Sequence, residues 1–204
     1  MEIFGHLERL AASLYPLRIP IAVCLALLVV LSLVIAVRLG LHLVVQRHKL
    51  TASVVAVAAL AVLVPATYYL ASPLWIRTSL IEPPAAAPPA LAAGESGRVL
   101  QRGEFRGADD FHFGRGRALL SETMPDRYTL RVEDFSVRNG PDLFVYLSTN
   151  PNGYAADAVN LGTLKASDGT FNYDVPEGTD ISRIRSVIVW CRQFSVLFAT
   201  ATLT

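Results

Sequence analysis

The chain has 204 residues, of which 52% are hydrophobic and 17% are charged, and its formal net charge is +1. Soluble domains carry roughly 25% charged residues, and here almost all acidic residues follow Gly94. The composition therefore indicates a membrane part followed by a soluble part. The balanced charge, without a basic patch, excludes a nucleic-acid-binding protein.

Residues 1–18 precede the first long apolar run. They place Ile3, Leu7, Leu10 and Leu14 on one face of a helix. A short amphipathic segment of this kind is typical of a helix that lies in the membrane interface.

Residues 19–76 contain two uncharged apolar runs, 19–37 and 51–75. About 20 apolar residues suffice to cross the hydrocarbon core of a bilayer. Tyr68 and Trp75 lie toward the end of the second run, as expected of aromatic residues at a membrane interface. The sequence predicts two transmembrane helices joined by a short basic loop.

The loop between the two runs carries Arg38, Arg47 and Lys49. Short loops rich in Lys and Arg stay on the cytoplasmic side. We therefore expect an integral protein of the plasma or cytoplasmic membrane, with both ends of the chain on the extracytoplasmic side.

Residues 77–97 are rich in Pro and Ala and have no hydrophobic period. Such linkers are extended, semi-rigid spacers, so this one is expected to hold a domain away from the bilayer. The remainder, residues 98–204, is long enough for one independent core.

Residues 98–204 read as about eight short β-strands. Alternation over 127–137 slips phase at Glu133–Asp134, which predicts a β-bulge. Asn139–Gly140 predicts a turn, and Asp168–Gly169 predicts a hairpin turn between two strands. We expect an all-β sandwich, with a small barrel as the alternative.

Four segments occur in this order: GEFRGADDFHFGRGRALL, DFSVRNGPDLFVYLS, LGTLKASDGTFNYDVP and SVIVWCRQFSVLFATATL. Together they resemble the DM-thirteen domain, which is labelled an electron-transfer domain, over about residues 98–204. The resemblance implies a β-sandwich, often outside the cell beside a membrane anchor. It also implies a cysteine that acts in redox chemistry as a bare thiol or through a bound group such as haem. The matching position is Cys191.

Two interpretations of Cys191 stay open. A buried cysteine behaves as a small hydrophobic residue, which would be a structural role. A single cysteine in an exported domain indicates a reactive thiol instead. Neighbouring residues of a strand face opposite sides, so Arg192 would stabilise a thiolate only if the strand turns there. Without a CxxC or CxxCH motif, dithiol cycling and c-type haem attachment are excluded.

His112 is the only histidine of residues 98–204. Because His and Cys both serve as axial ligands of haem, a haem site formed by His112 and Cys191 is one hypothesis. The alternative is a strand residue turned to solvent. One His is too few for blue copper, and Asp109–Asp110 lies in no EF-hand pattern, so no metal site is predicted.

Two functions are consistent with these residues. The first is a membrane-anchored extracytoplasmic module that transfers electrons through Cys191, with the lipid bilayer and an envelope protein or redox partner as its contacts. The alternative is a non-catalytic envelope binding module in which Cys191 is structural. No hydrolase or nucleotide-binding motif occurs, so the sequence does not predict a classical enzyme.

Overall fold

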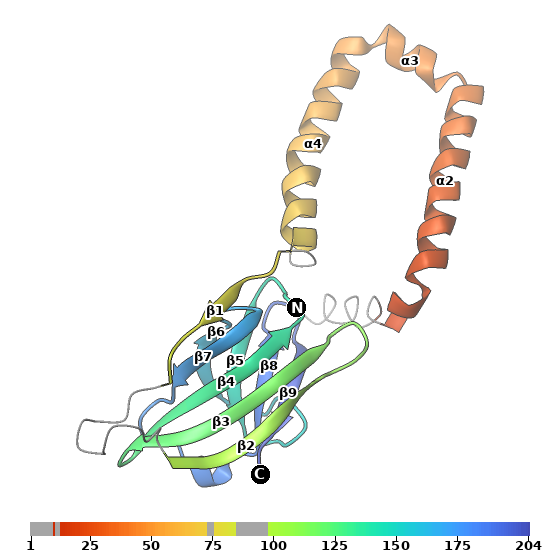
Figure 1. Ribbon diagram of the computed structural model, residues 1–204. Helices are drawn as coiled ribbons and strands as arrows, with labels where there is room; N and C mark the ends of the chain where they lie inside the picture. The colour runs from red at the N-terminus through yellow and green to blue at the C-terminus, as the bar shows by residue number, and fades with distance from the viewer. Residues whose placement is uncertain (1–9, 11–12, 73–75, 85–97) are drawn as a thin grey trace. The chain divides into compact units, whose positions relative to one another are not determined.

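The computed structural model describes residues 10, 13–72, 76–84 and 98–204. The chain divides into two compact units (Figure 1). One is helical and comprises Leu14–Ser72, and the other contains Pro73–Thr204 and is built around a β-sheet.

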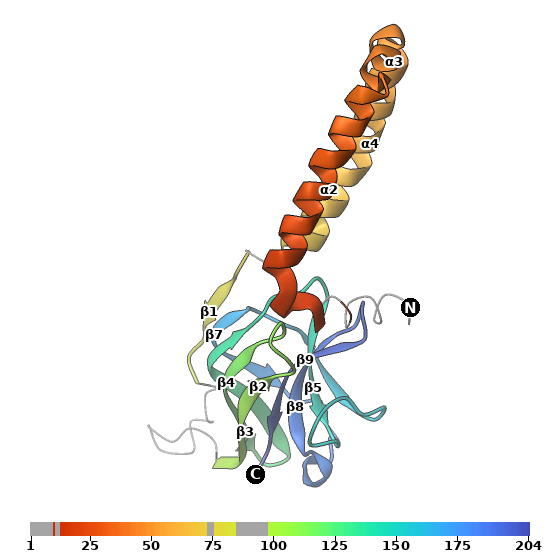
Figure 2. The same cartoon turned by 90° about the vertical axis from the view of Figure 1, so that its right-hand side faces the viewer.

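The helical unit contains two long apolar helices, α2 (Arg18–Arg38) and α4 (Lys49–Ala71). The short α3 (Leu41–Arg47) connects them. Figure 1 shows α2 and α4 as two separate limbs of an arch, which overlap only in the projection of Figure 2. Their apolar side chains are exposed, and both helices are long and apolar enough to cross a membrane. Pro65 lies inside α4 without ending it, as membrane helices tolerate.

The predicted interfacial helix of residues 1–18 lies mostly outside the described residues. Within them, Tyr15–Leu17 forms a single turn of 3-10 helix that leads into α2.

The other unit contains one nine-stranded sheet in the order β1-β7-β4-β3-β2-β9-β8-β5-β6. Its strands are β1 (Ser79–Ile81), β2 (Arg98–Gly107), β3 (Gly114–Met124), β4 (Arg127–Val137), β5 (Leu143–Ser148), β6 (Val159–Thr163), β7 (Asp168–Asp174), β8 (Ser186–Cys191) and β9 (Val196–Thr202).

The sheet curls into a half-barrel (Figure 1), and the predicted two-sheet sandwich is not confirmed. The reason is the long strand β2, which pairs with β3 over Arg98–Glu104 and with β9 over Phe105–Gly107. A Cβ at Gly103 would overlap the carbonyl oxygen of Thr202. Glycine therefore permits the close approach of β2 and β9 where the two halves of the sheet join.

The inner face of the curled sheet carries the apolar core. Phe105, Phe135 and Phe171 pack edge to face, with ring centroids 5.0 and 5.7 Å apart. The other wholly buried apolar side chains include Leu120, Leu130, Val132, Val145, Leu147, Val187 and Val189. The alternation that predicted these strands thus places one set of side chains in a common interior.

The predicted bulge at Glu133–Asp134 is confirmed. The register between β4 and β7 shifts between Val132 and Phe135, and Asp134 adopts a φ of 48°. The extra residue bends β4, as bulges do.

The predicted hairpin turn at Asp168–Gly169 is wrong, because both residues lie in β7. β7 pairs with β4 and, in parallel, with β1. Gly169 has a φ of 127°, and a Cβ there would overlap the carbonyl oxygen of Leu80 in β1. Glycine marks this position because a neighbouring backbone passes close to it, not because the chain turns.

The first part of the predicted linker, residues 77–84, packs on the sheet. β1 lies here, and Arg77 forms a two-point ion pair with Asp168 at 2.6 and 2.7 Å. Glu82 accepts hydrogen bonds from the backbone of Asn172 at 2.8 Å and from Lys165 at 3.0 Å. The structure therefore has nine strands where the sequence predicted about eight, because β1 lies in the predicted linker. Residues 85–97 of that linker lie outside the described residues.

Candidate functional site

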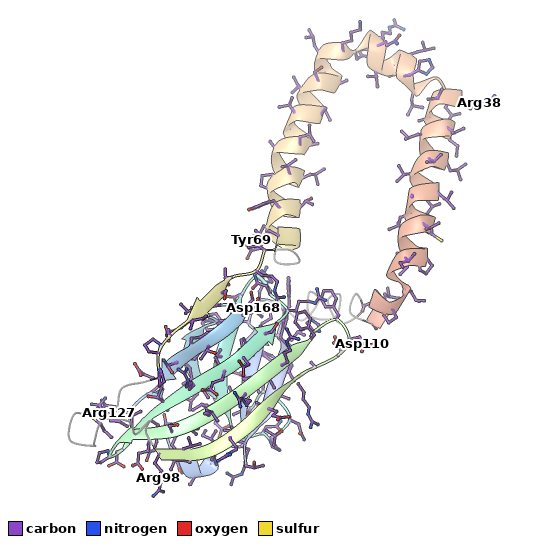
Figure 3. All side chains as sticks on the ribbon, viewed as in Figure 1. Arg38, Tyr69, Arg98, Asp110, Arg127 and Asp168 are labelled. Atoms are coloured by element: carbon purple, nitrogen blue, oxygen red, sulfur yellow. The ribbon has the colours of Figure 1, made fainter. Side chains whose placement is uncertain are left out.

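Three connections between strands meet at one end of the curled sheet. They join β2 to β3, β4 to β5, and β8 to β9. Backbone hydrogen bonds hold them: Arg138 N to Phe113 O at 3.0 Å, and Arg192 N to Asp142 O at 3.0 Å. Figure 3 labels Asp110 in the first connection, at the end opposite Arg98 and Arg127. We call this the loop end.

His112 lies at the loop end and is completely buried. Its Nδ1 is 2.8 Å from Oδ2 of Asp109. The other oxygen, Oδ1 of Asp109, accepts the backbone N–H groups of Phe111 and His112 at 2.8 and 2.7 Å. The expectation of a solvent-facing strand residue is therefore wrong. The Asp109 side chain folds the backbone into a tight turn, which carries the imidazole into the interior.

The Asp109 carboxylate is the charged partner of this buried imidazole. Burial raises the pKa of Asp109, but hydrogen bonds from the His112 side chain and backbone and from Phe111 lower it, so that the net pKa lies below its ordinary value. The carboxyl group consequently stays ionised near neutral pH and fixes the orientation of the ring.

Cys191 is the last residue of β8 and is completely buried on the inner face. Its cross-strand neighbours are Leu143 of β5 and Val196 of β9. Arg192 lies elsewhere, with its guanidinium 4.4 Å from the ring centroid of Phe144. Phe144 alternates with Leu143 and faces outward, so Arg192 is held on the other side of the sheet from the thiol.

His112 and Cys191 border the same apolar cluster, formed by Phe198, Leu143 and Gly140. The Phe198 ring centroid is 4.4 Å from that of His112. A Cβ at Gly140 would lie 2.9 Å from Phe198 and 3.1 Å from Leu143, which is the strand neighbour of Cys191. The fold thus brings two residues that are 79 positions apart in the sequence to one end of the core.

These surroundings do not fit a haem. The His112 ring lies between Phe111 and Phe198, at centroid distances of 4.9 and 4.4 Å, and both His112 and Cys191 have no exposed surface. A macrocycle bound at His112 would have to displace Phe198 from the core, and one bound at Cys191 would have to displace the side chains that enclose the thiol. Within the part of the chain that the structure describes, no three His, Cys, Asp or Glu side chains group as metal ligands.

An aromatic stack lies on the outer face beside Cys191, formed by Trp190, Tyr154 and Tyr146. Trp190 and Tyr154 are stacked with centroids 4.8 Å apart, and Tyr154 meets Tyr146 edge to face at 5.5 Å. Tyr146 is nearly buried, and this burial raises its pKa, whereas Tyr154 is 41% exposed. Sequence reasoning missed the stack, because Tyr154 comes from a loop and no periodicity assigns it to a strand face.

One comparison with known proteins gives a match. A family model described as "Electron transfer DM13" matches residues 106–203. No curated protein and no solved structure matches the chain. The matched span contains Asp109, His112, Tyr154, Trp190 and Cys191.

Proposed function

We propose that this chain, whose residues 106–203 belong to the electron transfer DM13 family, is a membrane-anchored extracytoplasmic module that transfers electrons through the thiol of Cys191. The family match is the observation that carries the proposal. DM13 is the same family as the DM-thirteen domain that the sequence resembles. The two apolar helices support the anchor, and the basic residues between them support the orientation.

The burial of Cys191 favours electron transfer over thiol exchange. Disulfide exchange requires direct attack between two sulfur atoms in contact, and Cys191 has no exposed surface. An electron, unlike a reagent, can cross a packed interior without contact between donor and acceptor. A bare thiol is the form of the site that suits these surroundings, since they do not fit a haem.

The aromatic stack provides a route from the sulfur to the surface. Trp190 adjoins Cys191 in β8 and stacks on Tyr154, which is 41% exposed. In the proposed step Cys191 loses one electron and its thiol proton, and an oxidised one-electron carrier protein gains the electron. The proton passes to water during a local opening of the chain around Cys191, because the closed structure leaves the thiol no exposed surface. Reduction by a second carrier reverses the step.

The proposal is tested on the full chain in lipid nanodiscs, in a Cys24→Ser background that leaves Cys191 as the only thiol. A photo-oxidised ruthenium polypyridyl complex serves as the one-electron acceptor, and electron paramagnetic resonance detects the radicals. We expect an aromatic radical that decays as Cys191 is oxidised. The decay should be several times slower in Trp190→Phe and in Tyr154→Phe.

Tyr128→Phe is the matched control, because Tyr128 packs against the core and lies outside the aromatic stack. It should leave the decay unchanged. An identical decay in a folded Cys191→Ala protein would contradict the assignment of the thiol. Stoichiometric haem in the purified chain, seen as a Soret band, would contradict the bare-thiol form of the proposal.

The orientation is tested separately, because the buried Cys191 should not react with a maleimide. A cysteine introduced at the exposed turn residue Asp126 (Asp126→Cys) replaces it as the target. An impermeant maleimide should label this variant on intact cells. Labelling that occurs only after lysis would place the domain on the cytoplasmic side.

A further inference from the structure

A polar groove lies on the outer face of the sheet, away from the loop end. It has a volume of about 610 Å³, within the range of roughly 300–1,000 Å³ that is usual for small-ligand sites. The side chains that line it project from β2, β3, β4 and β9 and from the last residue. They include Arg102, Glu104, Arg106, Arg117, Glu133 and Thr200.

The positive charges of the groove are only partly neutralised. Arg117 pairs with Glu133 at 3.3 Å and with Asp134 at 2.9 Å. In contrast, neither Arg102 nor Arg106 has an ion pair among the described residues. Two guanidinium groups, each able to bind a carboxylate at two points, are therefore available to a ligand.

Acceptors and hydroxyl groups lie between and beside these arginines. Glu104 projects from β2 between Arg102 and Arg106. On β9, Oγ1 of Thr200 is buried at the wall of the groove and has no hydrogen-bond partner among the described residues. Leu119 adds a small apolar surface. A buried hydroxyl without a partner costs about 1–3 kcal/mol, so a rotation of the Thr200 side chain that turns Oγ1 into the groove would let a ligand hydroxyl remove a cost that is already present.

We propose that this groove binds an acidic oligosaccharide, a function that is independent of electron transfer. Arg102 and Arg106 bind its carboxylates, and Glu104 and Thr200 bind its hydroxyl groups. A ligand that carries only negative charge fits less well, because Glu104 and Glu133 would repel it. A polyol with acid groups uses both the donors and the acceptors of the lining.

Isothermal titration calorimetry of the full chain in nanodiscs tests the proposal. The probes are hexagalacturonate and hexamannuronate, with maltohexaose as the neutral sugar and inorganic polyphosphate as the plain polyanion. At least one acidic sugar should bind more tightly than maltohexaose and polyphosphate. Arg102→Ala and Arg106→Ala should each weaken this binding about tenfold, as expected for the loss of about 1.4 kcal/mol in a charged hydrogen bond.

Two further variants separate this site from general attraction of anions. Arg98→Ala removes an arginine of the same strand that does not line the groove, and it should change binding less than about twofold. Thr200→Val removes the hydroxyl without changing charge or shape, and it should weaken sugar binding but not polyphosphate binding. Failure of both acidic sugars to bind the folded chain would overturn the proposal. Binding of polyphosphate that equals or exceeds that of the acidic sugars would also overturn it.

Discussion

The two faces of the hairpin β8–β9 carry opposite chemistry. On the inner face Val189, Cys191 and Ala199 are completely buried among apolar side chains. On the outer face Trp190 belongs to the aromatic stack, and Thr200 lines the polar groove. Residues adjacent in sequence thus meet different environments, because side chains alternate across a strand. Chemistry that requires contact with a reagent belongs to the outer face, whereas in the closed structure a residue enclosed on the inner face can exchange electrons with a partner only across the intervening protein.

The loop end combines features of both faces. His112 is as buried as Cys191, but its Nδ1 is 2.8 Å from a carboxylate oxygen that is partly exposed. A polar ring is stable in this interior because Asp109 satisfies it. Four substitutions test these contrasts between buried and exposed positions. They follow in order of the expected loss of stability, the largest first.

Phe198→Ala should destabilise the domain most, by about 3–5 kcal/mol, because it leaves a cavity beside His112, Gly140 and Leu143. Urea unfolding measures the loss, followed by the fluorescence of Trp190 in a Trp75→Phe background that leaves it as the only tryptophan. Leu197→Ala is the matched control, since Leu197 is the half-buried neighbour on the outer face. A cost for Leu197→Ala equal to that for Phe198→Ala would contradict the distinction between the faces.

Gly169→Ala should cost about 1–3 kcal/mol, because alanine is strained at a φ of 127° and its methyl group would strike Leu80 in β1. Because β1 would then separate from β7, trypsin should cleave the chain after Arg77 faster than in the parent protein. Gly162→Ala provides the comparison: its φ is 112°, but nothing lies within 4 Å of the added Cβ. If trypsin cleaves both variants at the same rate, the contact between residue 169 and β1 is not the cause of the faster cleavage.

Asp109→Asn should cost about 1 kcal/mol at pH 7, because His112 loses a charged partner. The pKa of Asp109 is lowered in the folded chain. Its stabilisation is therefore present above the ordinary value of 3.8 and is lost as the pH falls through the lower, folded value. Unfolding free energies at pH 7 and pH 2 should show the difference between variant and parent shrinking at low pH. Asp110→Asn, at the exposed neighbour, should show no such convergence.

Thr200→Val should not destabilise the domain and should stabilise it by up to about 1 kcal/mol, because the lost hydroxyl is buried and has no partner among the described residues. Ser148→Ala offers the contrast: the buried Ser148 hydroxyl donates to the carbonyl of Gly153 at 2.6 Å and accepts from Asn150 N at 3.1 Å. This variant should lose about 1–3 kcal/mol. Equal losses in the two variants would show that Thr200 Oγ1 does have a partner.

Local patterns in the sequence are sufficient for much of the architecture. The two apolar helices, the bulge at Glu133–Asp134 and the β8–β9 pair follow from composition, phase and alternation, which are properties of neighbouring residues. The family resemblance likewise rests on motifs that can be read along the chain, and those motifs alone are enough to single out Cys191.

The tertiary structure decided what depends on distant partners. The turn interpretation of Asp168–Gly169 failed because β1, almost 90 residues earlier, packs against Gly169. His112 is buried because its loop folds over Phe198, and the groove exists because β2 joins β3 to β9. Sequence periodicity specifies which side of a strand a residue occupies, but only the pairing of distant strands determines what that side faces.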